Sequence, residues 1–356
     1  MPGGRSLAPK IVLDTAPQLG GDLDLSGHKI ADGGVLQLYN DAANHRIVLG
    51  AAGGDTSVVI APNGAGALMA STGGDARGIY AIDLQMDRNA DSTAVASGER
   101  SVLIGSQSYA WGAMSCALGY GAQTFDDNSI AIGGNAVGAR SVAIGYFAAT
   151  GANDSFALGY LSYTYGIGSV AIGTNVNAWG DYSTAFPGSK TEMFAIYSFA
   201  IIKGYSYCAY QLSQANGNSP SQYGVMAQTH VLLESEQTSG TAPVQLTLDS
   251  NQGLLPILPD NTSWAFRILL VARSTDSASM NAAWNIFGCI KRDANAASTA
   301  LVGNVQYGTP INSPGWSCQV SADTANGALK IEVTGSAGKT VNWSARVEMA
   351  EIYHVN

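Results

Sequence analysis

Charged residues are scarce in this sequence of 356 residues, at 12% of the chain against about 25% in average globular proteins. The formal net charge is −9, which argues against a nucleic-acid partner, because such a partner needs a basic face. Apolar runs are short, and none reaches the about 18 residues of a membrane-spanning helix, so we expect no membrane insertion. No apolar run follows Met1 either, so we expect no secretion signal.

Residues that commonly bind metals or carry catalysis are few and dispersed. The four cysteines contain no CxxC pair, which argues against a zinc site. A Cys289–Cys318 disulfide is not favoured, since we expect folding in a reducing cytoplasm. The four histidines form no HxH or HExxH pattern, although copies of one histidine could meet on a threefold axis. We predict no cofactor, no metal site and no catalytic residues.

Carboxylates are not arranged for polysaccharide cleavage, which needs two carboxyl groups about 5–9 Å apart. Aspartates near the predicted turns commonly accept backbone hydrogen bonds instead; these are Asp126, Asp127, Asp154 and Asp181. Three glutamates are scattered along strand patterns near Lys330 and Arg346, and we expect surface ion pairs for them; these are Glu332, Glu348 and Glu351. We therefore predict that the protein is not an enzyme.

Glycine and small residues are abundant, with 43 glycines, and they form a repeat. The unit reads Ser-Val-Ala-Ile-Gly, and its serines are 14 residues apart except for one step of 12 from Ser129 to Ser141. It recurs at residues 101–105, 115–119, 129–133, 141–145, 155–159, 169–173 and, degraded, 183–187. A short fixed period of this kind predicts a solenoid of stacked β-coils.

Alternation within the repeat predicts how each coil is built. The second and fourth residues are bulky and apolar, so they share one face of a strand. We expect this face to point into the coil, with Cys116 among its residues, and the Ser and Ala face to contact a neighbouring chain. A second short strand follows, in which small residues alternate with large, often aromatic ones. Because such a thin coil buries too little surface to be stable alone, we predict an oligomer.

The repeat resembles the head repeat of trimeric autotransporter adhesins, in which Ser-Val-Ala-Ile-Gly is followed by Ala-x-Ala-x-Gly. The resemblance covers about a quarter of the chain, from Ser101 to Pro187. It implies a left-handed parallel β-roll and a homotrimer. We find no long heptad stalk and no C-terminal membrane-barrel segment, so we do not expect export to an outer membrane.

Other segments resemble tailed-bacteriophage fibre proteins. Residues 16–30 are similar to a segment near the start of such fibres, and residues 75–85 through 95–98 are similar to the lead-in to their rolls. The C-terminal part is similar to terminal domains of phage structural proteins. The resemblance implies localisation in the virion after assembly in the host cytoplasm, with other tail or capsid proteins as partners. The candidate virion-attachment residues are Leu19, Gly20, Gly21, Asp22, Leu23, Asp24 and Leu25.

Composition divides the chain into five expected parts. They are a virion-attachment arm (1–34), a β neck (35–96), a β-roll shaft (97–202), a linker (203–222) and a C-terminal antiparallel β-sandwich or jelly-roll head (223–356). Strands are expected in the head at residues 226–234, 244–248, 264–273, 283–291, 317–321, 329–334 and 341–352. Four tryptophans are assigned to its core: Trp264, Trp284, Trp316 and Trp343. The predicted fold class is all-β.

Aromatic residues in the repeat are the one set that points to binding. Some follow the corner glycine at equivalent positions, and others lie on the face opposite the small residues. Exposed rings with polar tips suit stacking on sugars. The alternative is that they stiffen the solenoid or fill a groove between chains. The candidate glycan-stacking residues are Tyr120, Tyr146, Tyr160, Tyr163, Tyr165 and Trp179.

The sequence therefore predicts a non-catalytic, homotrimeric bacteriophage tail fibre or receptor-binding protein. It would attach the virion to a host-surface polysaccharide by avidity, since several weak sites act together. A capsid-decorating or purely structural fibre is the first alternative. A polysaccharide-degrading tailspike is the second, and a bacterial surface adhesin comes last.

Overall fold

The computed structural model describes residues 68–69, 75–85, 87, 91–215, 225–249, 253–312 and 314–354. The chain divides into two compact units, Met1–Ala61 and Pro62–Asn356, and the described residues belong to the second. The predicted attachment arm, with the segment from Leu19 to Leu25, lies outside them, as do most of the predicted neck and residues 216–222. Within these limits the fold is all-β, as predicted, with a 3-10 turn at Ala296–Ser298 as the helical exception.

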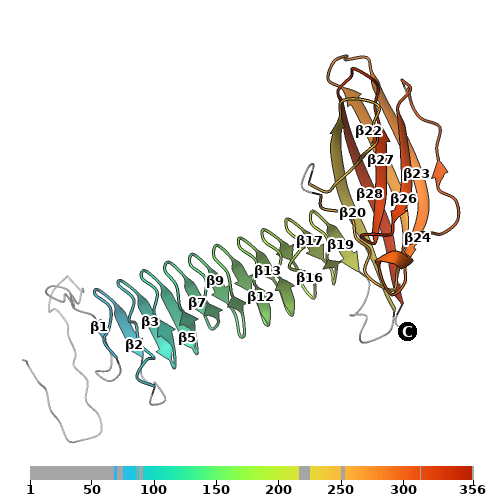
Figure 1. The fold of residues 1–356 in the computed structure, drawn as a ribbon. Coiled ribbons are helices and arrows are strands. Elements are labelled where there is room, and N and C mark those ends of the chain that lie inside the picture. Colours follow the sequence, from blue (N-terminus) through green and yellow to red (C-terminus); the bar gives the residue numbers. More distant parts are fainter. Residues whose placement is uncertain are drawn as a thin grey trace, which may run out of the picture. The chain divides into compact units, whose positions relative to one another are not determined.

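A parallel β-roll forms the first part of this unit (Figure 1). Each coil contributes one strand to a first roll sheet and one to a second roll sheet. The first roll sheet contains β2 (Ile82–Gln85), β3 (Val102–Ser106), β5 (Cys116–Tyr120), β7 (Ile130–Ile132), β9 (Val142–Ile144), β11 (Phe156–Leu158), β13 (Val170–Ile172), β15 (Thr184–Ala185), β17 (Phe199–Ile201) and β19 (Leu212–Ala215). At its start, β1 (Leu68–Met69) pairs in parallel with β2.

The second roll sheet has eight parallel strands. They are β4 (Tyr109–Ala110), β6 (Gln123–Thr124), β8 (Asn135–Ala136), β10 (Ala149–Thr150), β12 (Ser162–Thr164), β14 (Val176–Ala178), β16 (Lys190–Thr191) and β18 (Tyr205–Ser206). The register keeps the sequence period, because Val142, Phe156 and Val170 are successive partners, 14 residues apart. The 12-residue step is kept as well, since Ile130 pairs with Val142. The predicted solenoid is therefore confirmed.

The direction in which the repeat residues point is opposite to our prediction. Ser and Ala of the repeat are buried inside the coil, as Ser141 and Ala143 show at 0% exposure, whereas Ile132 on the other face is 40% exposed. Cys116 is half-buried on this outer face. The interior between the two roll sheets holds mostly small side chains, with Leu103 and Val176 as larger buried exceptions, and most of the bulky apolar residues of the repeat point outward.

Hydroxyl groups inside the coil explain the recurrence of serine. Ser141 Oγ donates to the carbonyl oxygen of Gly138 at 2.5 Å, and Thr150 Oγ1 on the second roll sheet donates to Ser141 Oγ at 2.8 Å. The same bond, from a serine Oγ to the carbonyl oxygen three residues earlier in the chain, occurs at Ser129, Ser155, Ser169, Ser183 and Ser198. Each serine hydroxyl thus adds a hydrogen bond that closes a turn at the coil corner.

The second part of the unit is a two-sheet antiparallel domain, the terminal domain (Figure 1). Its larger sheet has the order β20 (Val225–Thr238), β28 (Val341–His354), β22 (Thr262–Ser274) and β23 (Asn281–Arg292). Two short strands, β24 (Ala300–Leu301) and β25 (Gln306–Tyr307), pair with β23. The smaller sheet contains β21 (Val244–Gln245), β27 (Ala328–Thr334) and β26 (Ser317–Asp323).

Residues from both sheets fill one core, which includes Leu232, Ile286 and Leu329. The four tryptophans assigned to the core are buried, with Trp264 at 0% and Trp284, the most exposed, at 5%. Each of the seven predicted strand segments overlaps an observed strand.

A hydrogen-bonded seam joins the last coil of the roll to the terminal domain, where β19 pairs with β20 in antiparallel register. Gln211 Nε2 lies 2.5 Å from His230 Nδ1. Glu351 accepts hydrogen bonds from Trp264 Nε1, at 2.5 Å, and from the hydroxyl of Tyr207. Burial, and then the charge of Glu351, hold the pKa of Tyr207 well above its ordinary value.

The predicted surface position of Glu351 is wrong, because it is 3% exposed and satisfied by donors from both parts. The ion pairs expected for the other two glutamates are present, at 2.9 Å for Lys330–Glu332 and 2.9 Å for Arg346–Glu348.

Candidate functional site

The outer face of the second roll sheet carries a cluster of rings and charges, which we call the aromatic face. It consists of Tyr163, Tyr165, Trp179, Lys190, Glu192 and Tyr205. Strands β12, β14, β16 and β18 bring these residues together, because Tyr163 and Lys190 are both partners of Asn177, and Lys190 is in turn the partner of Tyr205. Alternation along each strand turns them outward, while Thr164 and Ala178 face the interior at 0% exposure.

Lys190 is the centre of the aromatic face. Its Nζ lies 4.4 Å from the ring centroid of Trp179 and 5.5 Å from that of Tyr205, and it forms a 2.7 Å ion pair with Glu192 Oε1. The ring of Tyr165 meets Trp179 edge-on, with centroids 5.6 Å apart. The side chains of Lys190 and Glu192 are 35% and 26% exposed, so both reach solvent between the rings. Cation–π contacts of this kind hold a lysine in a fixed direction.

Protonation states at the aromatic face follow from these contacts. Partial burial raises the pKa of Glu192, but hydrogen bonds from Lys190 and Tyr205 outweigh it, and the net pKa lies below the ordinary value. Burial, and then the hydrogen bond to Glu192, raise the pKa of Tyr205 well above its ordinary value. At neutral pH the face therefore presents an ionised carboxylate at Glu192 and a neutral phenol at Tyr205. Rings beside such donors and acceptors match the apolar faces and hydroxyl edges of a sugar.

The corner tyrosines of the sequence analysis are only partly brought together. Tyr146 and Tyr160 stack with centroids 6.1 Å apart and planes 11° from parallel. Tyr120 instead donates from its hydroxyl to Gln107 Oε1 at 3.0 Å. The 12-residue coil lies between them, and it turns at Gly133 and Gly134 where neighbouring coils have a tyrosine. The missing ring interrupts the expected ladder.

A different set of tyrosines forms an uninterrupted ladder at the opposite corner. Tyr182 and Tyr197 stack at 5.1 Å and 7°, and Tyr197 and Tyr210 stack at 5.3 Å and 16°. All three have left-handed backbone, with φ of 54°, 53° and 56°. This conformation costs a non-glycine residue about 1–2 kcal/mol, and an aromatic pair contributes about 0.5–1.5 kcal/mol, so the two stacked pairs offset part of the strain of the three residues.

Sequence reasoning missed Lys190, Glu192, Tyr205 and the corner ladder. The repeat degrades after Ser183, where the coil lengths change to 15 and then 13 residues (Ser183 to Ser198 to Gln211). The motif therefore no longer marks the equivalent positions. The spacing of tyrosines before each coil start was the available signal.

Three of the four aspartates near the coil corners have structural partners. Asp127 and Asp181 accept backbone N–H groups from Ala113 and Ile167, each at 2.8 Å. Asp154 forms a bidentate ion pair with Arg140, at 2.7 and 2.8 Å, and this hydrogen bond lowers the pKa of Asp154. In the part of the chain that the structure describes, no group of three His, Cys, Asp or Glu side chains is placed to hold a metal. No helix in that part has the length and apolar character to cross a membrane.

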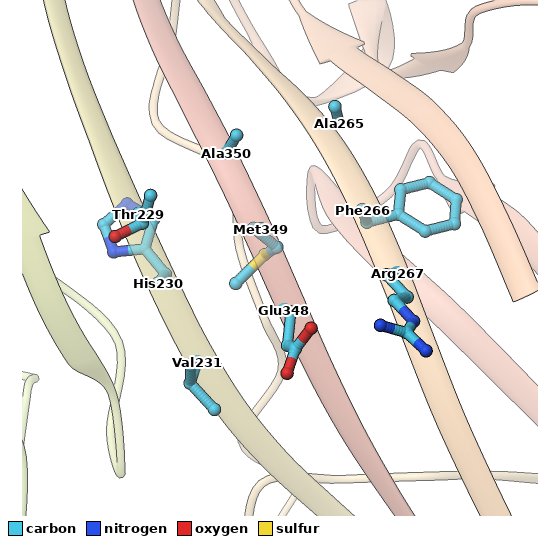
Figure 2. Close-up of a pocket in the computed structure, with 9 residues that line it drawn as sticks. All are labelled: Thr229, His230, Val231, Ala265, Phe266, Arg267, Glu348, Met349 and Ala350. Atoms are coloured by element: carbon cyan, nitrogen blue, oxygen red, sulfur yellow. The ribbon is translucent and has the colours of Figure 1, made fainter. Parts of the chain in front are cut away.

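A shallow pocket of about 460 Å³ lies on the larger sheet of the terminal domain (Figure 2). Its lining comes from β20, β28 and β22, with Ala265 and Ala350 beside the charged Arg267 and Glu348. Arg267 also donates to Asn285 Oδ1 at 3.2 Å, and Glu348 is paired with Arg346. The charges of this pocket are thus engaged with neighbours, and its rings are few, so it is a weaker candidate than the aromatic face.

One family model matches segments of the roll. Residues 110–136, 136–162 and 165–186 match the family described as YadA head domain repeat (2 copies). The matched segments cover less than half of the chain and lie within the roll. No curated protein matches the sequence.

Two solved structures are similar to the chain, both with a TM-score of 0.23. One is the tailspike protein gp49 of Acinetobacter baumannii bacteriophage Fri1, a capsular polysaccharide depolymerase, at 11% identity over 80% of this chain and 50% of that one. The other is the tailspike protein of Acinetobacter phage vB_ApiP_P1, at 8% identity over 78% of this chain and 55% of that one. The chain thus spans about half the length of each tailspike. At this similarity neither structure assigns a site or a residue to it.

The prediction that the protein is not an enzyme is contradicted by this comparison, because one of the two similar structures is a depolymerase. Our reasoning rested on the absence of a paired-carboxylate pattern in one sequence. Such pairs are assembled by folding, and in a trimer also between chains, so spacing along a chain does not reveal them. The prediction is withdrawn.

Proposed function

We propose that the chain is a bacteriophage receptor-binding tailspike or tail fibre that binds a polysaccharide of the host surface through its aromatic face. The placement of Lys190 between Trp179 and Tyr205, beside Glu192, carries the proposal. Rings supply flat apolar surface, while the ion pair and the phenol supply hydrogen-bonding groups that fix a sugar's orientation. The fibre resemblance of residues 16–30 supports placement in a virion.

We propose further that the working form is a homotrimer. The first roll sheet exposes a stripe of large apolar side chains, among them Ile104, Ile130 and Ile132 at 44%, 38% and 40%. Contiguous apolar stripes of this kind mark protein–protein contact. Association through this stripe leaves the aromatic face, on the opposite roll sheet, free for a ligand. Three copies per fibre then multiply a weak single-site affinity.

A binding experiment on the full chain tests the proposed function. The protein is applied to an array of purified bacterial capsular polysaccharides and lipopolysaccharide O-chains, Acinetobacter baumannii types included. We expect binding to at least one, and a loss of about tenfold or more for Trp179→Ala, since central aromatic anchors carry much of a binding energy. Trp111→Ala is the matched control, because Trp111 is an exposed ring, at 41%, outside the aromatic face.

Failure of the wild-type protein to bind any polysaccharide would overturn the proposal, as would unchanged binding by Trp179→Ala. Reducing-end release, followed in the same samples, separates binding alone from binding with cleavage.

A further inference from the structure

In the ladder of Tyr182, Tyr197 and Tyr210 the stacked rings alone can serve the structure. The hydroxyl groups are not needed for stacking. Each residue precedes the first strand of its coil, the position that Asn128 and Gly168 occupy in earlier coils. Those residues are better suited to left-handed backbone than tyrosine. Arg140 takes the same left-handed backbone at this corner, and so does Tyr80 in an earlier coil, so several residue types are accepted there. What distinguishes Tyr182, Tyr197 and Tyr210 is that tyrosine recurs in three consecutive coils and the rings stack.

The hydroxyl groups of the ladder are its available chemistry. The ring faces between neighbouring tyrosines are covered by stacking, and the Tyr182 ring lies against Gly168, where a Cβ would come within 2.8 Å of it. Exposure is 55%, 52% and 39% for Tyr182, Tyr197 and Tyr210. No hydrogen bond joins their hydroxyls to any residue that the structure describes, whereas the hydroxyls of Tyr109 and Tyr205 bind carboxylates.

The ladder begins beside the aromatic face, since Tyr182 follows Trp179 by three residues in the same coil. Its hydroxyls recur once per coil, and the rings are spaced 5.1 and 5.3 Å along the stack. The sugar rings of an extended polysaccharide follow one another at a comparable spacing. A polysaccharide lying across the coils would thus meet one phenol per sugar. Phenols can both donate hydrogen bonds to sugar hydroxyls and accept hydrogen bonds from them.

We infer that the ladder of Tyr182, Tyr197 and Tyr210 is a second polysaccharide-binding row, which holds an extended sugar chain parallel to the axis of the roll by one hydroxyl contact per coil. This inference rests on the proposed function and adds to it the conformation and direction of the ligand. It assigns the phenol hydroxyls to binding and the ring stack to stability.

The test is the triple variant Tyr182→Phe, Tyr197→Phe and Tyr210→Phe in the full chain. Phenylalanine keeps the stacked rings and removes the hydroxyls, so the melting temperature should not change. The probe is the array polysaccharide that the wild-type protein binds most tightly, used intact and as fragments of increasing length. We expect about tenfold weaker binding of the intact polymer and a smaller gain of affinity with fragment length. The exposed Tyr80→Phe, at 53% exposure, is the matched control.

Equal affinity and equal length dependence in the triple variant and the wild type would overturn the inference. If Trp179→Ala loses binding in the same experiment, the proposed function still holds. A wild-type protein that binds no polysaccharide overturns both. A lowered melting temperature with unchanged affinity would assign the hydroxyls to stability and overturn the second row.

Discussion

Alanine and serine fill most of the interior of the roll because the two roll sheets approach closely, although Leu103 is buried at the equivalent position of an earlier coil. Ala143, Ala157 and Ala171 are all at 0% exposure, on successive coils. Hydrophobic burial per coil is therefore small. Hydrogen bonds from serine hydroxyls to backbone carbonyls contribute to the stability of the interior beside it. The same crowding drives Val, Ile and Phe outward and produces the apolar stripe of the first roll sheet.

Enlarging one interior alanine should disrupt the roll. Ala157→Leu adds three carbon atoms at a position that is 0% exposed, and overpacking of this kind costs about 1–3 kcal/mol. Thermal unfolding followed by circular dichroism should show a clearly lower melting temperature. Leu158→Ala, on the outer face at 37% exposure, is the control and should change the fold far less. Equal stability of Ala157→Leu and the wild type would contradict the assigned facing.

Glu234 is a buried carboxyl in the terminal domain, at 1% exposure, and neither of its oxygens has a hydrogen-bond partner among the described residues. Burial raises its pKa from 4.5 to about 8. The folded state therefore keeps a proton that the unfolded chain releases, and this group's contribution to stability is lost as pH rises from about 4.5 to 8.

Replacing Glu234 by Gln should remove that loss. Urea unfolding across this pH range should give nearly equal stability for Glu234→Gln and the wild type near pH 4.5 and a growing advantage for the variant up to pH 8. A shift of this size corresponds to on the order of 5 kcal/mol at its upper limit. A stability difference that does not change with pH would show that Glu234 is not the group responsible.

At the scale of the element, glycines set the distance between coils. A Cβ on Gly138 would lie 2.1 Å from the carbonyl oxygen of Ala152 in the next coil, although Gly138 has no left-handed backbone. Gly121 is the opposite case, with φ of 66° and nothing within 4 Å of its Cβ position. Two glycines of one roll thus serve different purposes, close approach and backbone conformation.

The comparison of Gly138→Ala with Gly121→Ala separates the two purposes. Gly121→Ala should cost about 1–2 kcal/mol, the usual penalty of left-handed backbone. Gly138→Ala must displace a backbone carbonyl and so should cost more, with a lower denaturation midpoint in urea. If the two variants lose equal stability, the coils are not held at the distance described.

Strands were predictable from the sequence where alternation was long. Segment 264–273 falls within β22, whose burial alternates over thirteen residues and whose buried positions include Trp264, Phe266 and Ile268. The two-residue strands β24 and β25 carry no such pattern and were missed. Within the roll, the strand positions followed from the period, but the facing did not. A strand alternates with period two, so only the space inside the coil decides which face is buried.

The candidate site was predictable in part for the same reason. Tyr163, Tyr165 and Trp179 lie in coils with a clear motif and were singled out. Lys190 and Tyr205 lie beyond Pro187, where coil lengths vary, and their neighbourhood with Trp179 depends on the pairing of β14, β16 and β18. The charge of Lys190 and the ring of Tyr205 did not reveal the aromatic face in the sequence, because the register of the paired strands creates it.

At the scale of the whole molecule, the two outer faces of the roll have different character. The first roll sheet presents apolar, mostly aliphatic side chains with Phe199 among them, and the second presents rings with charged groups between them. An aliphatic stripe left in water favours association, so we predict three chains per particle, joined at this stripe. Light scattering coupled to size exclusion should give a mass three times that of one chain. Ile132→Glu, in the middle of the stripe, should lower it, and a monomeric wild-type protein would contradict the assembly.

The most direct measurement of the proposed function is an experimental structure of the full chain with an oligosaccharide prepared from the polysaccharide that it binds. The account predicts sugar density on the second roll sheet, in contact with Trp179 and Lys190 and running across β12 to β18 towards the ladder of Tyr182, Tyr197 and Tyr210. Density confined to the terminal-domain pocket beside Arg267 and Glu348, with none on the roll, would contradict it.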